Sequence, residues 1–238
     1  MRNMILGAAL MVALGTGGAA AAATSYPDMA PYAQYAMVSQ DAEVALARSA
    51  APASIARDAS VMTLSEHGYE TVVKGSNGFV CIVERSWANG VLDDGFWNPK
   101  LRGPLCFNAA AARSVLPAYL ERTRWVLAGV SRAEIERRVR TAVASGHYTP
   151  PEIGAMCFML SKGGYLGDAA GGPWHPHLMF FLPTASGGPS SWGANLDGAP
   201  LLASTDPVEP VTTFYIPVAK WSDGTPDGGP SAEHMHGQ

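Results

Sequence analysis

The sequence predicts a single α+β domain with a mostly antiparallel sheet and helices packed on one face, preceded by a cleaved signal peptide. Three observations support this prediction. Residues 60–85 are rich in β-branched side chains, residues 108–162 carry helix caps and helical periodicity, and residues 177–221 hold short apolar runs between turns. Because strands both precede and follow the block of helices, we expect one sheet with the helices grouped together.

The first 23 residues have the pattern of a secretory signal. Arg2 provides a positive start, residues 4–14 are apolar, and residues 19–23 are a run of small side chains typical of a cleavage site. The apolar part is too short to span a bilayer, and no later segment is long and apolar enough to do so. We therefore expect cleavage near Ala23 and a periplasmic or secreted protein with no membrane span in the mature chain.

The rest of the chain divides into three parts. Residues 24–38 contain tyrosines and prolines and are expected to form a surface leader; residues 39–222 form the globular domain, and residues 223–238 form a flexible tail. Cleavage would remove one positive charge, Arg2, which changes the net charge from −4 to −5. This mildly acidic balance argues against nucleic acid as a partner.

The first helix is predicted over residues 40–49. Ser39 is of the residue type preferred at a helix N-cap, and two acidic residues follow in the first turn, where they favour the helix dipole. Pro52 ends this helix, and a further turn is expected over residues 53–59.

Three strands are predicted next, at residues 60–65, 69–74 and 79–85. The sequence Gly-Ser-Asn-Gly at residues 75–78 separates the second strand from the third and is expected to form a hairpin turn. Residues 86–103 hold many turn-forming side chains and are expected to be irregular.

The chain has three cysteines, and two of them are predicted to pair. Cys81 and Cys106 flank a loop-like stretch, and an oxidising compartment permits a disulfide between them. Cys157 lies in an apolar run and is predicted to be a free, buried thiol. Its neighbours provide neither the base nor the positive charge that a nucleophilic thiol needs.

Two helices are predicted in the middle of the chain. One runs over residues 109–127, with Asn108 at its N-cap and Pro117 as a point where it kinks or splits. Ser131 and Glu134 form a capping box, which opens the other helix.

A further helix is predicted over residues 153–162. Thr149 and Glu152 form a second capping box with two prolines between them, and the residues that follow are nearly all apolar, as in a buried helix. The remainder is rich in glycine and proline, and strands are expected there at residues 177–182, 199–203 and 211–221.

Common catalytic motifs are absent, and the sequence Trp174-His175-Pro176-His177 is the main functional candidate. No Gly-x-Ser-x-Gly, His-Glu-x-x-His, Cys-x-x-Cys or phosphate-binding loop occurs. In an extended chain, residues two apart point to the same side, so the two histidines could bind one divalent metal or supply a general base. The alternative is that both histidines are structural and hydrogen-bond to backbone groups.

The segment before these histidines could line the same pocket. The candidate binding residues are Tyr165, Trp174, His175 and His177. The candidate catalytic residues are His175, His177, Asp168 and Ser161. A metal site would use His175 and His177 and would need further ligands, for which the candidates are Asp168, His67 and His147.

The sequence leaves three classes of function open. The first is a small-ligand-binding or accessory domain with its pocket at the Trp-His-Pro-His segment. The second is a hydrolase-type enzyme that uses His175 or His177 as a base or as a metal ligand. The third is a structural envelope protein without a small-molecule site. A small molecule or an envelope component would be the partner, and a divalent metal is the candidate cofactor.

Overall fold

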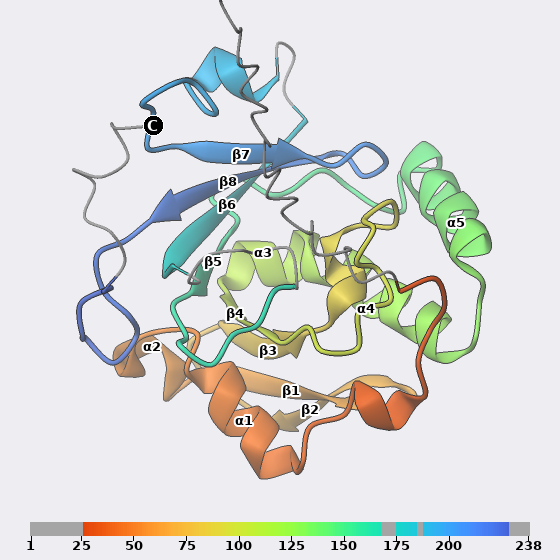
Figure 1. The fold of residues 1–238 in the computed structure, drawn as a ribbon, viewed down its shortest axis with the longest axis horizontal. Helices are drawn as coiled ribbons and strands as arrows, with labels where there is room; N and C mark the ends of the chain where they lie inside the picture. The colour runs from red at the N-terminus through yellow and green to blue at the C-terminus, as the bar shows by residue number, and fades with distance from the viewer. Residues whose placement is uncertain (1–25, 168–174, 185–187, 229–238) are drawn as a thin grey trace, which may run out of the picture.

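The computed structural model describes residues 26–167, 175–184 and 188–228, which form one mixed sheet with helices around it (Figure 1). The eight strands follow the order β2-β1-β3-β4-β5-β6-β8-β7. All neighbouring strands are antiparallel except β1 and β3, which are parallel. The α+β architecture with a mostly antiparallel sheet is therefore confirmed, while the predicted signal peptide lies outside the described residues.

Six of the eight strands lie where the sequence predicts them, and β4 and β5 do not. The strands are β1 (Ser60–Ser65), β2 (Gly68–Val73), β3 (Val80–Glu84), β4 (Gly103–Phe107), β5 (Met156–Met159), β6 (His177–Pro183), β7 (Leu202–Thr205) and β8 (Val211–Pro217). In the part of the chain that the structure describes, no helix is both long and apolar enough to cross a membrane.

The hairpin predicted at residues 75–78 is wrong. β2 does not pair with β3, because β1 lies between them and forms its own hairpin with β2. Residues 75–78 instead cross over to place β3 parallel to β1. A side chain at Gly75 would overlap the backbone at Ser60, so only glycine fits this close approach.

The helix predicted over residues 153–162 is also wrong, since this segment contains the central strand β5. It pairs with β4 on one side and with β6 on the other. A strand that is covered on both faces is apolar at every position, and so it cannot be told from a buried helix by periodicity alone.

The described helices are α1 (Gln40–Arg48), α2 (Ala53–Ala56), α3 (Ala109–Ser114), α4 (Leu116–Leu127) and α5 (Arg132–Ala144), with short 3-10 turns η1 (Tyr32–Gln34), η2 (Ser86–Asn89) and η3 (Pro189–Trp192). Of these, α1, α3 and α5 begin at predicted caps. The side chains of Ser39, Asn108 and Ser131 each accept a hydrogen bond from a first-turn backbone N–H. The predicted break near Pro117 separates α3 from α4.

Helices cover both faces of the sheet, which corrects the prediction of a single covered face. Cys81 and Val83 project from β3 into an apolar cluster with α1, whereas Ile82 projects into the larger core with α3 and α4. Successive side chains of a strand point to opposite faces, and β3 and β4 are buried along nearly their whole length. Both faces therefore need a helical cover.

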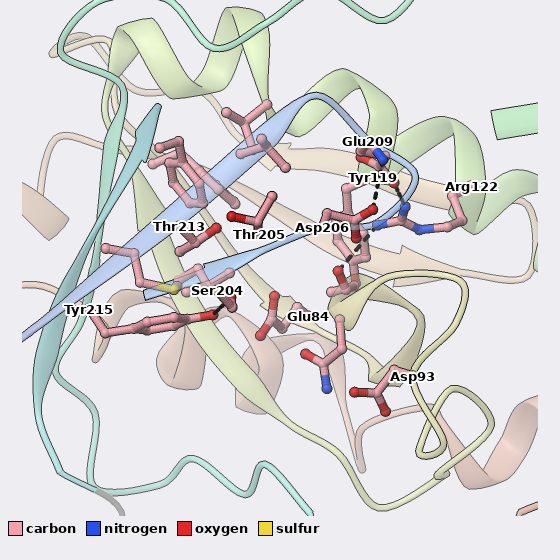
Figure 2. A pocket seen from close by; sticks show the side chains of 18 of the residues that line it. Glu84, Asp93, Tyr119, Arg122, Ser204, Thr205, Asp206, Glu209, Thr213 and Tyr215 are labelled. Carbon is pink, nitrogen blue, oxygen red and sulfur yellow. Dashed lines mark hydrogen bonds and ion pairs between the residues drawn. The ribbon is translucent and has the colours of Figure 1, made fainter. Parts of the chain in front are cut away.

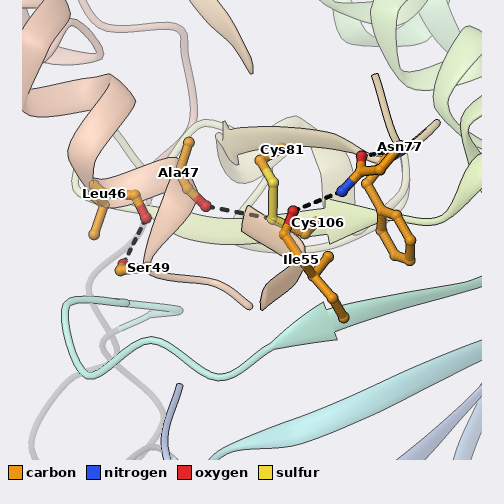
Figure 3. The surroundings of a disulfide bond; sticks show 8 residues. Leu46, Ala47, Ser49, Ile55, Asn77, Cys81 and Cys106 are labelled. Atoms are coloured by element: carbon orange, nitrogen blue, oxygen red, sulfur yellow. Dashed lines mark hydrogen bonds between the residues drawn. A yellow bond between two sulfur atoms is a disulfide. The ribbon is translucent and has the colours of Figure 1, made fainter. Parts of the chain in front are cut away.

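The predicted disulfide between Cys81 and Cys106 is confirmed (Figure 3). The two residues lie directly opposite each other on β3 and β4, and α1 packs over the bridge. Cys157 is buried and not disulfide-bonded, as predicted, although it lies on β5. Its burial raises the pKa of the thiol, which is the opposite of what a nucleophilic cysteine requires.

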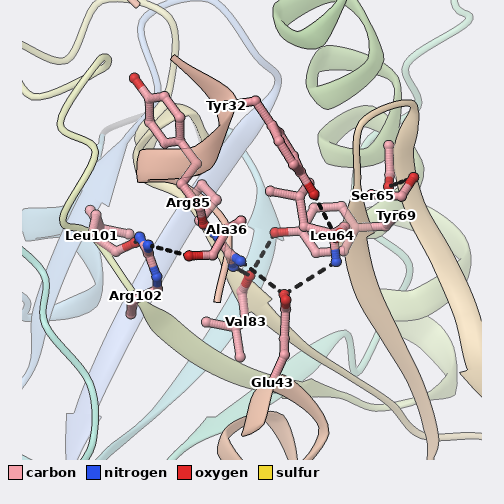
Figure 4. A network of polar contacts seen from close by, with 12 residues as sticks. Tyr32, Ala36, Glu43, Leu64, Ser65, Tyr69, Val83, Arg85, Leu101 and Arg102 are labelled. Carbon is pink, nitrogen blue, oxygen red and sulfur yellow. Dashed lines mark hydrogen bonds and ion pairs between the residues drawn. The ribbon is translucent and has the colours of Figure 1, made fainter. Parts of the chain in front are cut away.

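A buried ion pair joins α1 to the end of β3 (Figure 4). The Arg85 guanidinium donates to Glu43 Oε1 at 2.9 Å and to the Tyr35 carbonyl at 2.7 Å. The same Glu43 oxygen accepts a hydrogen bond from the Leu64 backbone N–H at 3.2 Å. Both charged groups are therefore satisfied by several partners inside the core.

Part of the predicted surface leader, residues 24–38, contributes to the core. Tyr35 is fully buried, and its hydroxyl donates to the Trp97 carbonyl at 2.9 Å. Its ring lies 4.9 Å from the ring of Trp87. The expectation that this segment lies on the surface therefore fails at Tyr35, whose burial and hydrogen bonds outweigh the loop-like composition around it.

Candidate functional site

A cavity of about 480 Å³ lies on the sheet face that α3 and α4 cover (Figure 2). Its floor consists of alternate residues of three strands, as the two-residue period of a strand requires: Leu105, Phe107, Met179, Phe181, Thr213 and Tyr215. Val115, between α3 and α4, and Tyr119 on α4 form the wall opposite the sheet. The η2 turn and the β7–β8 turn, residues 206–210, form the polar rim.

Glu84 is the buried acid of this cavity. It ends β3 on the same face as Ile82, is 8% exposed, and lines the cavity into which its carboxyl points (Figure 2). Its partner in the strand pair is Gly103, where any side chain would overlap the Glu84 carboxyl. No group within residues 26–167, 175–184 and 188–228 forms a hydrogen bond with that carboxyl.

Burial changes the protonation of Glu84. Removal from water raises the pKa of its carboxyl to about 8, and the positive charge of Arg122 offsets only part of this effect. At neutral pH the group is therefore mostly a protonated carboxylic acid, which can donate one hydrogen bond and accept another.

Arg122 fixes one side of the cavity. It is 3% exposed, forms an ion pair with Glu209, and donates to the Ala88 carbonyl at 3.2 Å. These contacts tie α4 to the β7–β8 turn and to η2. The Nε atom of Arg122 is buried and has no hydrogen-bond partner among the described residues.

The β7–β8 turn is held in place by Asp206. One oxygen of its carboxylate accepts hydrogen bonds from the backbone N–H groups of Val208 and Glu209, both at 2.7 Å. The other oxygen lies against Gly90, where a Cβ atom would be only 2.6 Å away. Because Gly90 also has a φ of 101°, it allows the loop after η2 to approach the turn closely.

The predicted histidine segment lies beside this cavity. His177 starts β6 on the same face as Met179, and its ring centroid is 5.8 Å from that of Tyr215. Its Nδ1 is 2.9 Å from the His175 carbonyl, which can only accept, so Nδ1 carries the proton. Desolvation lowers the pKa of His177, which favours this neutral form.

His175 pairs with the end of the described chain. Its Nδ1 lies 2.7 Å from the Asp227 carboxylate, and 43% of the His175 side chain is exposed. Asp227 also donates its backbone N–H to the Ala219 carbonyl at 2.9 Å. The predicted flexible tail, residues 223–238, is therefore held by these contacts up to Asp227.

The other predicted site residues occupy separate surroundings. Ser161 is buried, with its Oγ 2.6 Å from Ser49 Oγ, and Tyr165 exchanges two backbone hydrogen bonds of 2.8 Å with Arg102. Neither residue lines the cavity. Asp168 and Trp174 lie outside the described residues.

The described residues do not bring the predicted metal ligands together. His147 lies 3.1 Å from Glu121, and His67 is exposed in the β1–β2 turn. Within the described ranges, no three side chains of His, Cys, Asp or Glu converge as metal ligands.

Four polar residues of the cavity were not predicted from the sequence: Glu84, Arg122, Asp206 and Glu209. One local signal existed for Glu84. It follows five apolar residues of the strand predicted over residues 79–85 and shares the parity of Ile82, a pattern that places a carboxylate on a face of apolar side chains. The other three converge only through the tertiary fold.

Comparisons with protein-family models, with curated proteins and with solved structures found no match for this chain. The chemistry of the cavity is therefore the basis for a functional interpretation. A mainly apolar floor with a few converging polar groups and an acid of perturbed pKa is typical of small-molecule sites.

Proposed function

We propose that this protein is an exported small-ligand-binding protein and that its ligand occupies the cavity above β4, β6 and β8. The observation that carries this proposal is the Glu84 carboxyl, which is buried in the cavity without a hydrogen-bond partner among the described residues. The Glu84 oxygens are accessible from the cavity, so a ligand there can hydrogen-bond to them, and the cavity volume lies within the usual range for small-molecule sites.

The cavity lies next to the predicted pocket segment. His175 and His177 do not line it, but β6, which begins at His177, supplies Met179 and Phe181 to the cavity floor. Export is supported by the signal-like first 23 residues and by the Cys81–Cys106 disulfide, which suits an oxidising compartment.

The binding site can be tested by filling the cavity. Thr213 lines the cavity, whereas Ile216 on the same strand projects from the opposite face, so Thr213→Trp and Ile216→Trp form a matched pair. We expect ligand-detected NMR with a fragment library of cationic, neutral and anionic members to find compounds that bind the wild type and Ile216→Trp but not Thr213→Trp. If no compound of any charge shows this pattern, the proposed function is wrong and a structural role is favoured.

A hydrolase is the second candidate, favoured by the 2.7 Å contact between His175 and Asp227. A carboxylate in this position can orient an imidazole, which suits a general base. Such an enzyme would hydrolyse p-nitrophenyl butyrate, lose this activity in His175→Ala, and keep it in Glu66→Gln, which changes an exposed turn. Equal rates in wild type and His175→Ala exclude this role for His175.

A further inference from the structure

We propose that the ligand is an organic cation with an aromatic or apolar body, whose ammonium group binds at Glu84 inside the cavity. This proposal rests on the proposed function and adds the chemical class of the ligand and the residue that recognises its charge.

The charged groups of the cavity favour a cation. Four carboxyl side chains line it, from Glu84, Asp93, Asp206 and Glu209, against one basic side chain, Arg122. Two of the three Arg122 guanidinium nitrogens are already engaged, Nη1 by Glu209 and Nη2 by a backbone carbonyl, while the buried Nε has no partner among the described residues. An anionic ligand would therefore meet a negative potential, while a cationic ligand is attracted into the cavity.

Glu84 supplies the specific contact that an acidic rim alone would not provide. The titratable or charged groups that interact electrostatically with it come from β2, α4, β5 and β8: Tyr69, Tyr119, Arg122, Cys157 and Tyr215. Arg122 is the single cation in this set. Tyr119 already hydrogen-bonds to Tyr69 at 3.0 Å and accepts from the Arg85 backbone N–H at 2.8 Å. An ammonium group would therefore provide the counter-ion and the hydrogen bonds that the Glu84 carboxyl lacks.

The remaining walls fit an aromatic or apolar body. The rings of Phe107 and Phe181 are stacked with their centroids 6.1 Å apart on the cavity floor, and Tyr215 lies beyond Met179 on β8. Such surfaces bury apolar groups and attract cations. Because no three carboxylate, imidazole or thiol side chains converge within the described ranges, an organic cation fits the cavity better than a metal ion.

Binding an ammonium group would release a proton. The Glu84 carboxylic acid gives its proton to solvent, and the resulting carboxylate forms an ion pair with the ligand ammonium, which keeps its own proton. Because the free carboxyl has a pKa of about 8, the affinity for a cation increases by up to about tenfold for each unit by which the pH rises toward 8. Above pH 8 the affinity levels off. A neutral ligand that needs the carboxylic acid as a donor shows the opposite trend and weakens above pH 8.

The proposal can be tested by calorimetry with three compounds of similar shape: tryptamine, tryptophol and indole-3-acetate. We expect tryptamine to bind at least tenfold more tightly than tryptophol at pH 8 and indole-3-acetate not to bind. Titrations of tryptamine at pH 7 in phosphate and in Tris should show the release of about one proton. Tryptamine affinity should rise at least tenfold from pH 6 to pH 8.

Glu84→Gln separates charge recognition from the shape of the cavity, because glutamine keeps the size and hydrogen-bonding capacity of the side chain. We expect this variant to bind tryptamine at least tenfold more weakly, without proton release, and to bind tryptophol like the wild type. Glu66→Gln should behave like the wild type throughout, and circular dichroism should show that all variants are folded.

Three results overturn the proposal. In the first, tryptophol or indole-3-acetate binds at least as tightly as tryptamine. In the second, Glu84→Gln binds tryptamine as tightly as the wild type does. In the third, tryptamine does not bind at all. If neutral or anionic fragments still bind in a manner that Thr213→Trp abolishes, the small-ligand-binding function stands and only the ligand class is wrong. If no fragment binds in that manner, the proposed function itself fails.

Discussion

Replacing Glu84 with glutamine should stabilise the protein near neutral pH. In the unfolded chain, Glu84 loses its proton near its ordinary pKa of 4.5, whereas in the fold the pKa of the buried carboxyl is about 8. Between these two values the folded state binds more protons than the unfolded state, so the contribution of Glu84 to stability falls as the pH rises. Glutamine is neutral in both states, and its contribution does not change with pH.

The size of the effect follows from the distance between the two pKa values. Each pH unit above 4.5 costs the wild type about 1.4 kcal/mol until the pH reaches about 8. At pH 7 the accumulated cost is about 3 kcal/mol, a sizeable share of the 5–15 kcal/mol by which small domains are typically stable. The variant should therefore gain about 3 kcal/mol over the wild type at pH 7 and little at pH 4.5.

Urea unfolding followed by tryptophan fluorescence measures this difference. The free energy of unfolding of Glu84→Gln minus that of the wild type should grow by about 2–3 kcal/mol between pH 5.5 and pH 7.5. Glu66→Gln, which changes an exposed carboxyl, controls for the loss of one negative charge. A stability difference that is the same at both pH values would refute the raised pKa and the burial on which it depends.

Two further predictions concern the supports of the fold. In the Cys81→Ala/Cys106→Ala double variant, the free energy of unfolding should fall by about 3.5 kcal/mol, because the bridge closes a loop with a sequence separation of 25. Reduction of the wild type should give the same decrease in urea unfolding. Arg85→Ala should lower the free energy of unfolding by about 3–5 kcal/mol, since it leaves Glu43 buried without its counter-ion. The double variant Arg85→Met/Glu43→Leu should recover most of this stability in the same assay. Equal losses in the single and double variants would show that packing, and not the uncompensated charge, sets the cost.

Local signals in the sequence located most of the elements. Ser39, Asn108 and Ser131 are helix caps because a short polar side chain can satisfy a first-turn N–H wherever it occurs in the chain. The strands toward the two edges of the sheet, β1, β2, β7 and β8, combine apolar and polar residues and have turn residues at their ends. These are also local signals, so these strands can be predicted from the sequence. The disulfide followed from spacing and compartment, and its two cysteines do face each other across β3 and β4.

The central strands were harder to predict because burial removes their pattern. β4 is buried on both faces, and β5 is buried on one face and half-buried on the other, so their residues do not alternate between apolar and polar, and the apolar run at β5 is equally typical of a buried helix. The sequence also predicted helices on one face of the sheet only, because the number of faces that helices cover depends on which strands pair. A parallel β1–β3 contact required the crossover at residues 75–78, which has the composition of a hairpin turn.

The candidate site shows the same limit in its chemistry. A histidine attracts attention in a sequence because its ordinary pKa lies near neutrality, whereas a glutamate reaches that range only when a fold buries it. For Glu84 the burial depends on the absence of a side chain at Gly103, on the position of α4 and on a turn held by Asp206, all distant in the chain. An acid that lowers stability at neutral pH conflicts with the rest of the core, and such conflicts are expected where function requires them. The stability gain predicted for Glu84→Gln and the binding loss predicted for the same variant are thus two consequences of one buried carboxyl.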